Sequence, residues 1–217
     1  MVEVRTQTRA AVPPERSAKA RAVGRSGGVE GNARLTATTA VVLLGLLATE
    51  GVTVVFLRPL LSVHVFVGMM LIPPIALKLG TTGWRFLRFY TGSLPYRMRG
   101  APQVFLRLVV APGVILSTFF LFASGVALLV VGPGGGVVLG LHKASFVVWF
   151  VAMAAHVLAH VARLPALATA DWARPTRLPS APVRLGLVTG ALVLGTALAA
   201  GTLHLAQPWI EWARLAH

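Results

Sequence analysis

Residues 142–160 read HKASFVVWFVAMAAHVLAH, an apolar run with histidines near both of its ends. A helix rises about 1.5 Å and turns about 100° per residue, so the step from His142 to His156 spans roughly 21 Å and leaves the rings about 40° apart around the axis. The two histidines therefore lie on nearly the same face, one near each end of a membrane span. Neutral imidazole is a common axial ligand of haem iron, so this face predicts haem ligation inside a membrane.

The composition indicates an integral membrane protein. Apolar residues make up 56% of the chain and charged residues 12%, which is far from the balance of a soluble domain. Crossing a bilayer takes about 20 predominantly apolar residues. Stretches of that kind occur at residues 36–57, 60–80, 104–131, 136–162 and 184–206, so we expect an all-α membrane helical bundle of about five transmembrane helices within residues 36–206.

Both ends of the chain are expected to lie outside this bundle. Residues 1–35 are rich in Arg, Ala, Gly and Pro and contain few large apolar groups, which predicts a disordered basic tail. Residues 207–217 follow the last apolar stretch and are expected to form a second, short tail.

The formal net charge of +14 is distributed unevenly along the chain. Of the 20 Lys and Arg, all but Arg58, Lys143 and Arg214 fall before residue 36, between residues 78 and 107, or between residues 163 and 184. The positive-inside rule then places the N-terminus in the cytoplasm and the C-terminus outside the cytoplasmic membrane. We expect these charges to lie at the lipid surface, so the basic balance does not indicate nucleic-acid binding.

Depth in the membrane selects the histidines that can share an iron. With this topology His64 lies about 6 Å and His142 about 8 Å below the outer surface, on two different helices. They are the predicted axial ligands of an outer haem, and His204 is the other candidate at that level. The chain has no cysteine, which excludes iron–sulfur clusters and covalently attached c-type haem.

A second, inner site is less complete. His156 and His160 are four residues apart and share one helix face, so they cannot bind opposite sides of one porphyrin. A second helix must supply the other ligand, but the residue fourteen positions after His64 is Lys78. An amine ligates iron only after it loses its proton, and a second haem is therefore left open.

Three stretches carry a resemblance to a known family. LSVHVFVG at 61–68, FASGVALLVVGP at 122–133 and LHKASFVVWFVAMAAHVLAH at 141–160 resemble the membrane cytochrome b superfamily, which includes haem-binding subunits of hydrogenases and formate dehydrogenases. The resemblance implies a four-helix core that holds haem b, with His64, His142 and His156 as ligands and Gly68 leaving room for the porphyrin face. It also implies electron transfer between a quinone and a redox partner or catalytic subunit. Lys78 departs from the di-haem pattern of the family.

The sequence thus favours a haem-binding electron-transfer subunit over a self-contained enzyme, with His64, His142, His156, His160 and Gly68 as candidate cofactor-binding residues. Two alternatives are kept. A transporter for protons or a divalent metal would use His156, His160 and Glu50, since ionisable residues within spans often mark such pathways. An assembly subunit would bind no cofactor. Glu50 is alternatively expected to pair with Arg58 at the outer surface.

Two further patterns concern helix packing. Pro73 and Pro74 lie in the middle of the second apolar stretch, where they remove backbone donors and predict a kink. Gly186 and Gly190 have the GxxxG spacing, which is typical of helices in close contact.

Overall fold

The computed structural model describes residues 28–98, 100, 104–163, 168–171 and 178–215. These residues form helices joined by short turns, with no strand among them, which confirms the predicted all-α bundle. Five of the helices are long and apolar enough to cross a membrane, so the protein is a multi-pass membrane protein.

The five long helices are arranged as two hairpins and a final span. Their bounds are α2 Gly28–Val55, α3 Leu57–Tyr90, α5 Ala111–Val131, α6 Gly136–His160 and α8 Ala181–Thr202. Shorter elements occupy the connections and the C-terminus: α4 Leu94–Met98, the π-helical turn η1 Leu106–Val110, the 3-10 turns η2 Val161–Arg163 and η4 Leu203–Ala206, and α9 Gln207–Leu215.

Two helices extend beyond the boundaries that the sequence predicts, and a further helix forms in the expected C-terminal tail. α2 begins at Gly28, so residues 28–35 are helical and do not belong to a disordered tail, whereas residues 1–27 lie outside the described part. Tertiary contacts support this extra turn, because Asn32 Nδ2 donates to the Thr81 carbonyl at 3.1 Å. α3 continues through the Arg- and aromatic-rich residues up to Tyr90. Residues 207–215 of the expected C-terminal tail form α9.

The helical backbone of α3 is interrupted near its beginning. Pro73 and Pro74 lie inside the helix, and Leu60 is the interior residue whose dihedral angles leave the helical region, at φ −108° and ψ 16°. The break in helical dihedrals is therefore close to the α2–α3 turn and not at the prolines, where a kink was expected. Pro74 is buried in the bundle, so its neighbours cover the carbonyls that lose a donor.

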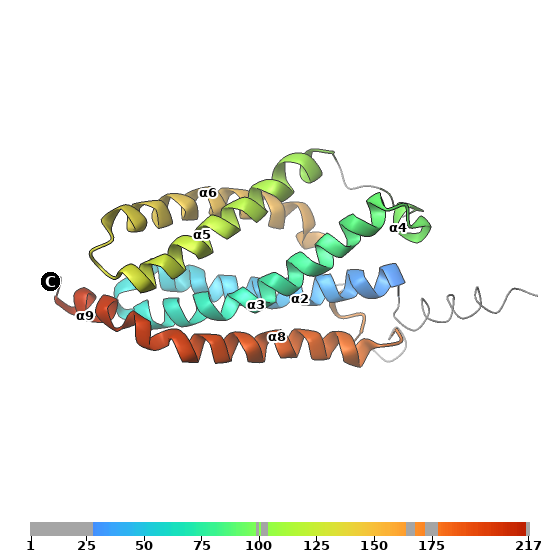
Figure 1. Ribbon diagram of the computed structural model, residues 1–217. Helices are drawn as coiled ribbons and strands as arrows, with labels where there is room; N and C mark the ends of the chain where they lie inside the picture. Colours follow the sequence, from blue (N-terminus) through green and yellow to red (C-terminus); the bar gives the residue numbers. More distant parts are fainter. Residues whose placement is uncertain (1–27, 99, 101–103, 164–167, 172–177, 216–217) are drawn as a thin grey trace, which may run out of the picture.

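The long helices form two groups. α3 packs along both α2 and α8, and α5 packs along α6 as a separate hairpin (Figure 1). The extensive backbone contacts of α6 in the described chain are with α5, η1 and η2. A small apolar core, formed by Leu43, Val67 and Leu71, receives Phe122 from α5 and so connects the two groups.

The closest contact between α3 and α8 is made at Gly195. A Cβ atom built there would collide with the backbone carbonyl oxygen of Met70 on α3. Gly186 and Gly190, by contrast, are exposed and have no atom within 4 Å of an added Cβ. The prediction of close packing at the GxxxG pair is therefore wrong, and a different glycine on the same helix makes the contact.

The hairpin is fixed internally and at one end. Within it, Trp149 Nε1 of α6 donates to Thr118 Oγ1 of α5 at 3.0 Å, and both residues are buried. At the end near the α5–α6 turn, Trp209 Nε1 of α9 donates to the Leu128 carbonyl of α5 at 2.8 Å. The C-terminal helix thus joins the hairpin to the three-helix group.

The opposite end of the bundle is joined by a buried ion cluster. Asp171, in the segment before α8, accepts from Arg34 Nη1 of α2 at 3.0 Å and from Arg184 Nε of α8 at 2.6 Å. Burial raises the pKa of the Asp171 carboxyl, but the hydrogen bonds and charges of Arg184 and Arg34 outweigh it and hold the pKa below its usual value. Asp171 was not singled out by the sequence, because a lone carboxylate in a connection has no periodic pattern.

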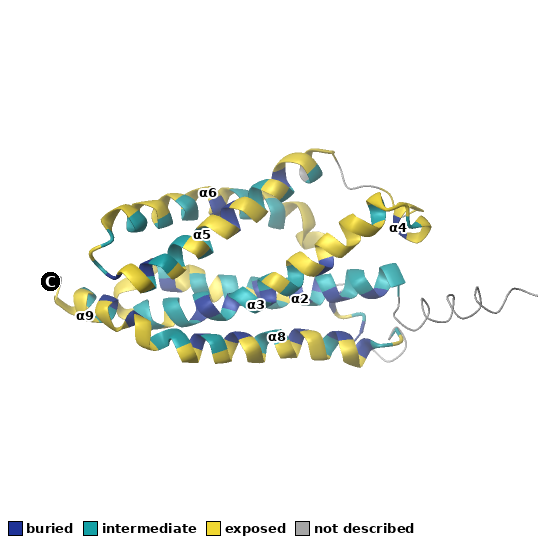
Figure 2. Ribbon diagram, viewed as in Figure 1, coloured by how far each residue is buried: buried dark blue, intermediate teal, exposed yellow. Residues whose placement is uncertain are grey.

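The long helices have many exposed residues (Figure 2), and large apolar side chains are numerous among them. On α6, for example, Val147, Val148 and Phe150 are exposed, and Trp149 is the buried residue of that helix. Exposed apolar side chains along a membrane span contact lipid. The expected contact with membrane lipid is thus supported by the burial pattern.

Candidate cofactor site

His64 lies on α3, and the two side chains that accept a hydrogen bond from its ring come from α2. Its Nδ1 is 3.0 Å from Oε1 of Glu50 and 3.0 Å from Oγ1 of Thr53. Thr53 Oγ1 donates to the Glu50 carbonyl at 2.7 Å, which leaves its lone pairs directed elsewhere. An ionised carboxylate only accepts hydrogen bonds, so we assign the ring proton to Nδ1 and the free lone pair to Nε2.

His142, near the start of α6, has the same arrangement with a different partner. Its Nδ1 is 3.0 Å from Ser124 Oγ on α5. Ser124 itself donates to the Leu121 carbonyl at 3.0 Å, so it accepts the hydrogen bond from His142. Nδ1 again carries the proton, and the lone pair is again on Nε2. Metal-binding histidines are normally oriented by a hydrogen bond from the ring nitrogen that does not bind the metal.

One glycine adjoins the ring of His142, and another adjoins the carboxylate that contacts His64. A Cβ built on Gly125 of α5 would lie 3.1 Å from Cε1 of His142, so the absence of a side chain there makes room for the ring. A Cβ built on Gly68, one turn after His64, would lie 3.4 Å from Oε1 of Glu50. The neighbour of Gly68 in the structure is therefore the carboxylate, and its predicted role beside a porphyrin remains a prediction.

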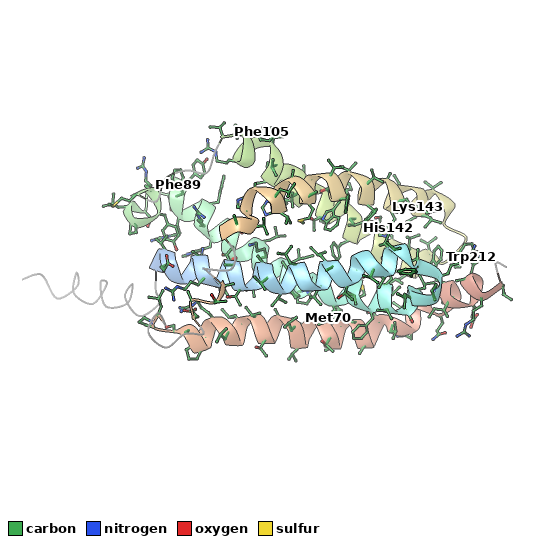
Figure 3. The ribbon with its side chains drawn as sticks, turned by 180° about the vertical axis from the view of Figure 1, so that it is seen from behind. Met70, Phe89, Phe105, His142, Lys143 and Trp212 are labelled. Carbon is green, nitrogen blue, oxygen red and sulfur yellow. The ribbon has the colours of Figure 1, made fainter. Side chains whose placement is uncertain are left out.

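The two histidines come from different helix groups, His64 from α3 and His142 from α6. His142 lies on the side of α6 that faces α2 and α3, whereas Lys143 follows it on the exposed surface (Figure 3). The rings of His64 and His142 are close enough to interact electrostatically. Their assignment as a ligand pair, which depth alone predicts, remains a prediction.

The inner histidines lie at the other end of α6. The rings of His156 and His160 stack with centroids 4.7 Å apart, and Nδ1 of His160 is 2.9 Å from the His156 carbonyl. Lys78 interacts electrostatically with His156, and its Nζ donates to the Thr36 carbonyl of α2 at 2.9 Å. The structure brings Lys78 and His156 near one another but gives no second histidine there, and the second haem stays a prediction.

The remaining sequence candidates lie apart from this arrangement. Glu50 is hydrogen-bonded to His64, not to the inner histidines that a transporter site would need. His204 is exposed in η4. Among the described residues, no three His, Cys, Asp or Glu gather closely enough to hold a metal ion by themselves.

Sequence reasoning found the two rings but missed the residues that orient them. Thr53 follows Glu50 by three positions, and Ser124 and Gly125 lie inside the FASG motif at 122–125. Hydroxyl side chains and glycines are common in apolar helices. Their contacts with a histidine ring are therefore recognised only when the position of the facing helix is known.

The arrangement offers two imidazole Nε2 atoms, each held by a hydrogen bond on the opposite nitrogen. Two imidazole nitrogens from different helices are a donor set that would suit haem iron. Comparisons with protein-family models, with curated proteins and with solved structures gave no match to this chain.

Proposed function

We propose that the protein binds one b-type haem between His64 and His142 and transfers electrons within the cytoplasmic membrane. The observation that carries this proposal is the matched hydrogen bonding of the two rings, at 3.0 Å on each Nδ1, which leaves both Nε2 atoms available. A bound haem supplies reversible one-electron chemistry. The protein's own residues hold the two imidazoles, fix their tautomers and surround them with an apolar bundle.

The two helix groups support the same proposal. α3 supplies His64 and α6 supplies His142, yet α6 makes its extensive contacts with α5 rather than with α3. A porphyrin bound between the groups would bury apolar surface of both, which stabilises the assembled bundle. The charge distribution favours a site near the outer surface, with the N-terminus in the cytoplasm.

The role of the protein would be that of a membrane subunit. Its described residues form only the membrane bundle and its short connections, so substrate chemistry is assigned to a partner protein. A quinone and a redox partner or catalytic subunit are the proposed electron donor and acceptor. Their identities do not enter the test below.

The proposal is tested by purifying the whole chain in detergent from haem-replete cells. We expect a b-type reduced-minus-oxidised spectrum and about one haem per polypeptide in a pyridine haemochrome assay. His64→Ala and His142→Ala should each remove the haem, because one axial bond is lost. His204→Ala is the matched control and should retain it, since His204 is exposed in η4.

The same measurement separates the alternatives. A colourless wild-type protein would overturn the proposal and favour the transporter or the cofactor-free assembly subunit. Retention of a full complement of haem in both His64→Ala and His142→Ala would overturn the assigned ligands. About two haems per polypeptide would direct attention to Lys78 and His156.

A further inference from the structure

The two proposed ligands differ in the group that accepts their Nδ1 proton. His64 donates to the carboxylate of Glu50, whereas His142 donates to the hydroxyl of Ser124. A carboxylate carries a negative charge and a hydroxyl does not. The difference is therefore electrostatic, and it affects only one of the two imidazoles directly.

Glu50 is held at this position by its neighbours. Oε1 of Glu50 is 3.0 Å from His64 Nδ1 and accepts its proton. Thr53 Oγ1 lies 3.2 Å from Oε2, but its single proton is donated to the Glu50 carbonyl. Gly68 adjoins the carboxylate, since a Cβ built there would be in van der Waals contact with Oε1, at 3.4 Å. The side chain of Glu50 is 17% exposed and that of His64 is 22% exposed, so little water screens the pair.

We propose that Glu50 is a positioning residue that makes His64 the stronger electron donor of the two ligands and lowers the midpoint reduction potential of the haem. This inference rests on the proposed haem site. A carboxylate that accepts from the second nitrogen of a metal-binding histidine increases the basicity of that ligand. A more basic ligand and a nearby negative charge both favour ferric over ferrous iron, because the ferric state carries one more positive charge.

The cost of the carboxylate fits this role. An ionisable side chain within a span is unfavourable unless it is partnered. The carboxylate of Glu50 has a partner in the Nδ1–H of His64, which is the proposed ligand. A hydroxyl alone orients the ring of His142, so orientation by itself does not require a carboxylate. The charge of Glu50 is the additional property that the inference uses.

The test is a potentiometric titration of the full-length haem-loaded protein in detergent, with haem content measured on each sample. Glu50→Gln keeps an oxygen acceptor of the same length but removes the charge. We expect it to retain haem and to shift the midpoint potential to more positive values. The electron paramagnetic resonance spectrum of the ferric state should also shift toward that of a weaker axial donor. Ser124→Ala, at the other ligand, is the control and should shift the potential less.

Each outcome decides the inference. Glu50→Gln with wild-type haem content and an unchanged midpoint potential overturns it, and the proposed haem site then still stands. If Glu50→Gln loses the haem, Glu50→Asp is the second variant to measure. It keeps the carboxylate charge but shortens the side chain by one methylene. Haem-loaded Glu50→Asp with a raised potential supports the inference, and an unchanged potential overturns it. Loss of haem in both variants also overturns it, because Glu50 would then serve assembly. Absence of haem in the wild type is instead the failure of the proposed function.

Discussion

A histidine in a membrane helix can be a ligand or a packing residue, and its hydrogen bonds separate the two roles. A packing histidine satisfies both ring nitrogens within the protein, since an unpaired polar atom in an apolar setting is costly. His64 and His142 each satisfy Nδ1 at 3.0 Å, and the described part of the chain gives no hydrogen bond to the Nε2 atom of either ring. At the scale of single residues, this is the feature that favours ligation.

Gly125 offers a test of that feature. A valine at this position would place its Cβ 3.1 Å from Cε1 of His142 and its methyl groups nearer still, so the ring must turn away from Ser124. We expect Gly125→Val to lower the haem content per polypeptide several-fold, measured by pyridine haemochrome. Gly186→Val is the matched control, because Gly186 has no atom within 4 Å of an added Cβ. Equal haem content in the two variants would contradict the assigned position of the ring.

The sequence predicts the two rings as ligands, but it does not predict the residues that hydrogen-bond to them. Histidine is rare in apolar helices, so depth and spacing single out His64 and His142. The sequence identifies Glu50 as an ionisable residue within a span, but it predicts pairing with Arg58 as readily as a functional role. Ser124, Thr53 and Gly125 have no such rarity, and their use depends on which helix faces them. Pairwise contacts of this kind follow from tertiary packing, which the spacing along one helix does not contain.

At the scale of helices, hydropathy predicted the spans well and the boundaries poorly. Each of the five long helices includes its predicted apolar stretch, wholly or for most of its length. Hydropathy, however, indicates only which residues lie in the membrane. A helix continues beyond them wherever backbone hydrogen bonds and contacts allow it. α3 therefore extends to Tyr90, and α2 begins at Gly28, where composition indicated an unstructured tail.

The contact between α3 and α8 gives a prediction at this scale. Gly195→Val should force the helices apart, since a Cβ there meets the backbone carbonyl of Met70, which cannot move aside like a flexible side chain. Overpacking of this kind costs about 1–3 kcal/mol. We expect a lower thermal unfolding midpoint in detergent, followed by circular dichroism. Gly190→Val changes an exposed glycine of the same helix and should have little effect; equal midpoints would show that the contact is not tight.

At the scale of the whole molecule, the two ends of the bundle are closed by different chemistry. Trp209 hydrogen-bonds to the Leu128 carbonyl at one end. Asp171 pairs with Arg34 and Arg184 at the other, where its side chain is only 3% exposed. Breaking a buried pair by removing one partner typically costs about 3–5 kcal/mol, because the other charges are left uncompensated. Global stability should therefore depend on the charge state of Asp171.

The pH dependence of unfolding tests this dependence. Because the pKa of Asp171 is held below its usual value, its contribution is fully present above the unfolded pKa of about 3.9 and is lost as the pH falls through the lower folded pKa. The wild type should therefore lose thermal stability on acidification below about pH 4 more steeply than Asp171→Asn. Asp171→Asn should already be less stable at neutral pH, measured as unfolding in detergent.

The control for this experiment is Glu30→Gln. Glu30 also contacts Arg34, at 3.3 Å, but its side chain is 37% exposed. Ion pairs at that exposure contribute about 0–1 kcal/mol, so this variant should keep the acid sensitivity of the wild type. Parallel pH profiles for the wild type and Asp171→Asn would contradict the assignment of the transition to Asp171.

The order of the helices has a consequence for biosynthesis. α5 and α6 are neighbours in the chain and in space, so this hairpin forms from local contacts as soon as both have left the ribosome. α8 packs along α3, one of the first helices to be inserted. The face of α3 around Met70 therefore stays open to lipid until the last span leaves the translocon. A nascent chain that stops before residue 181 lacks this partner and presents an unfinished surface to membrane proteases and chaperones.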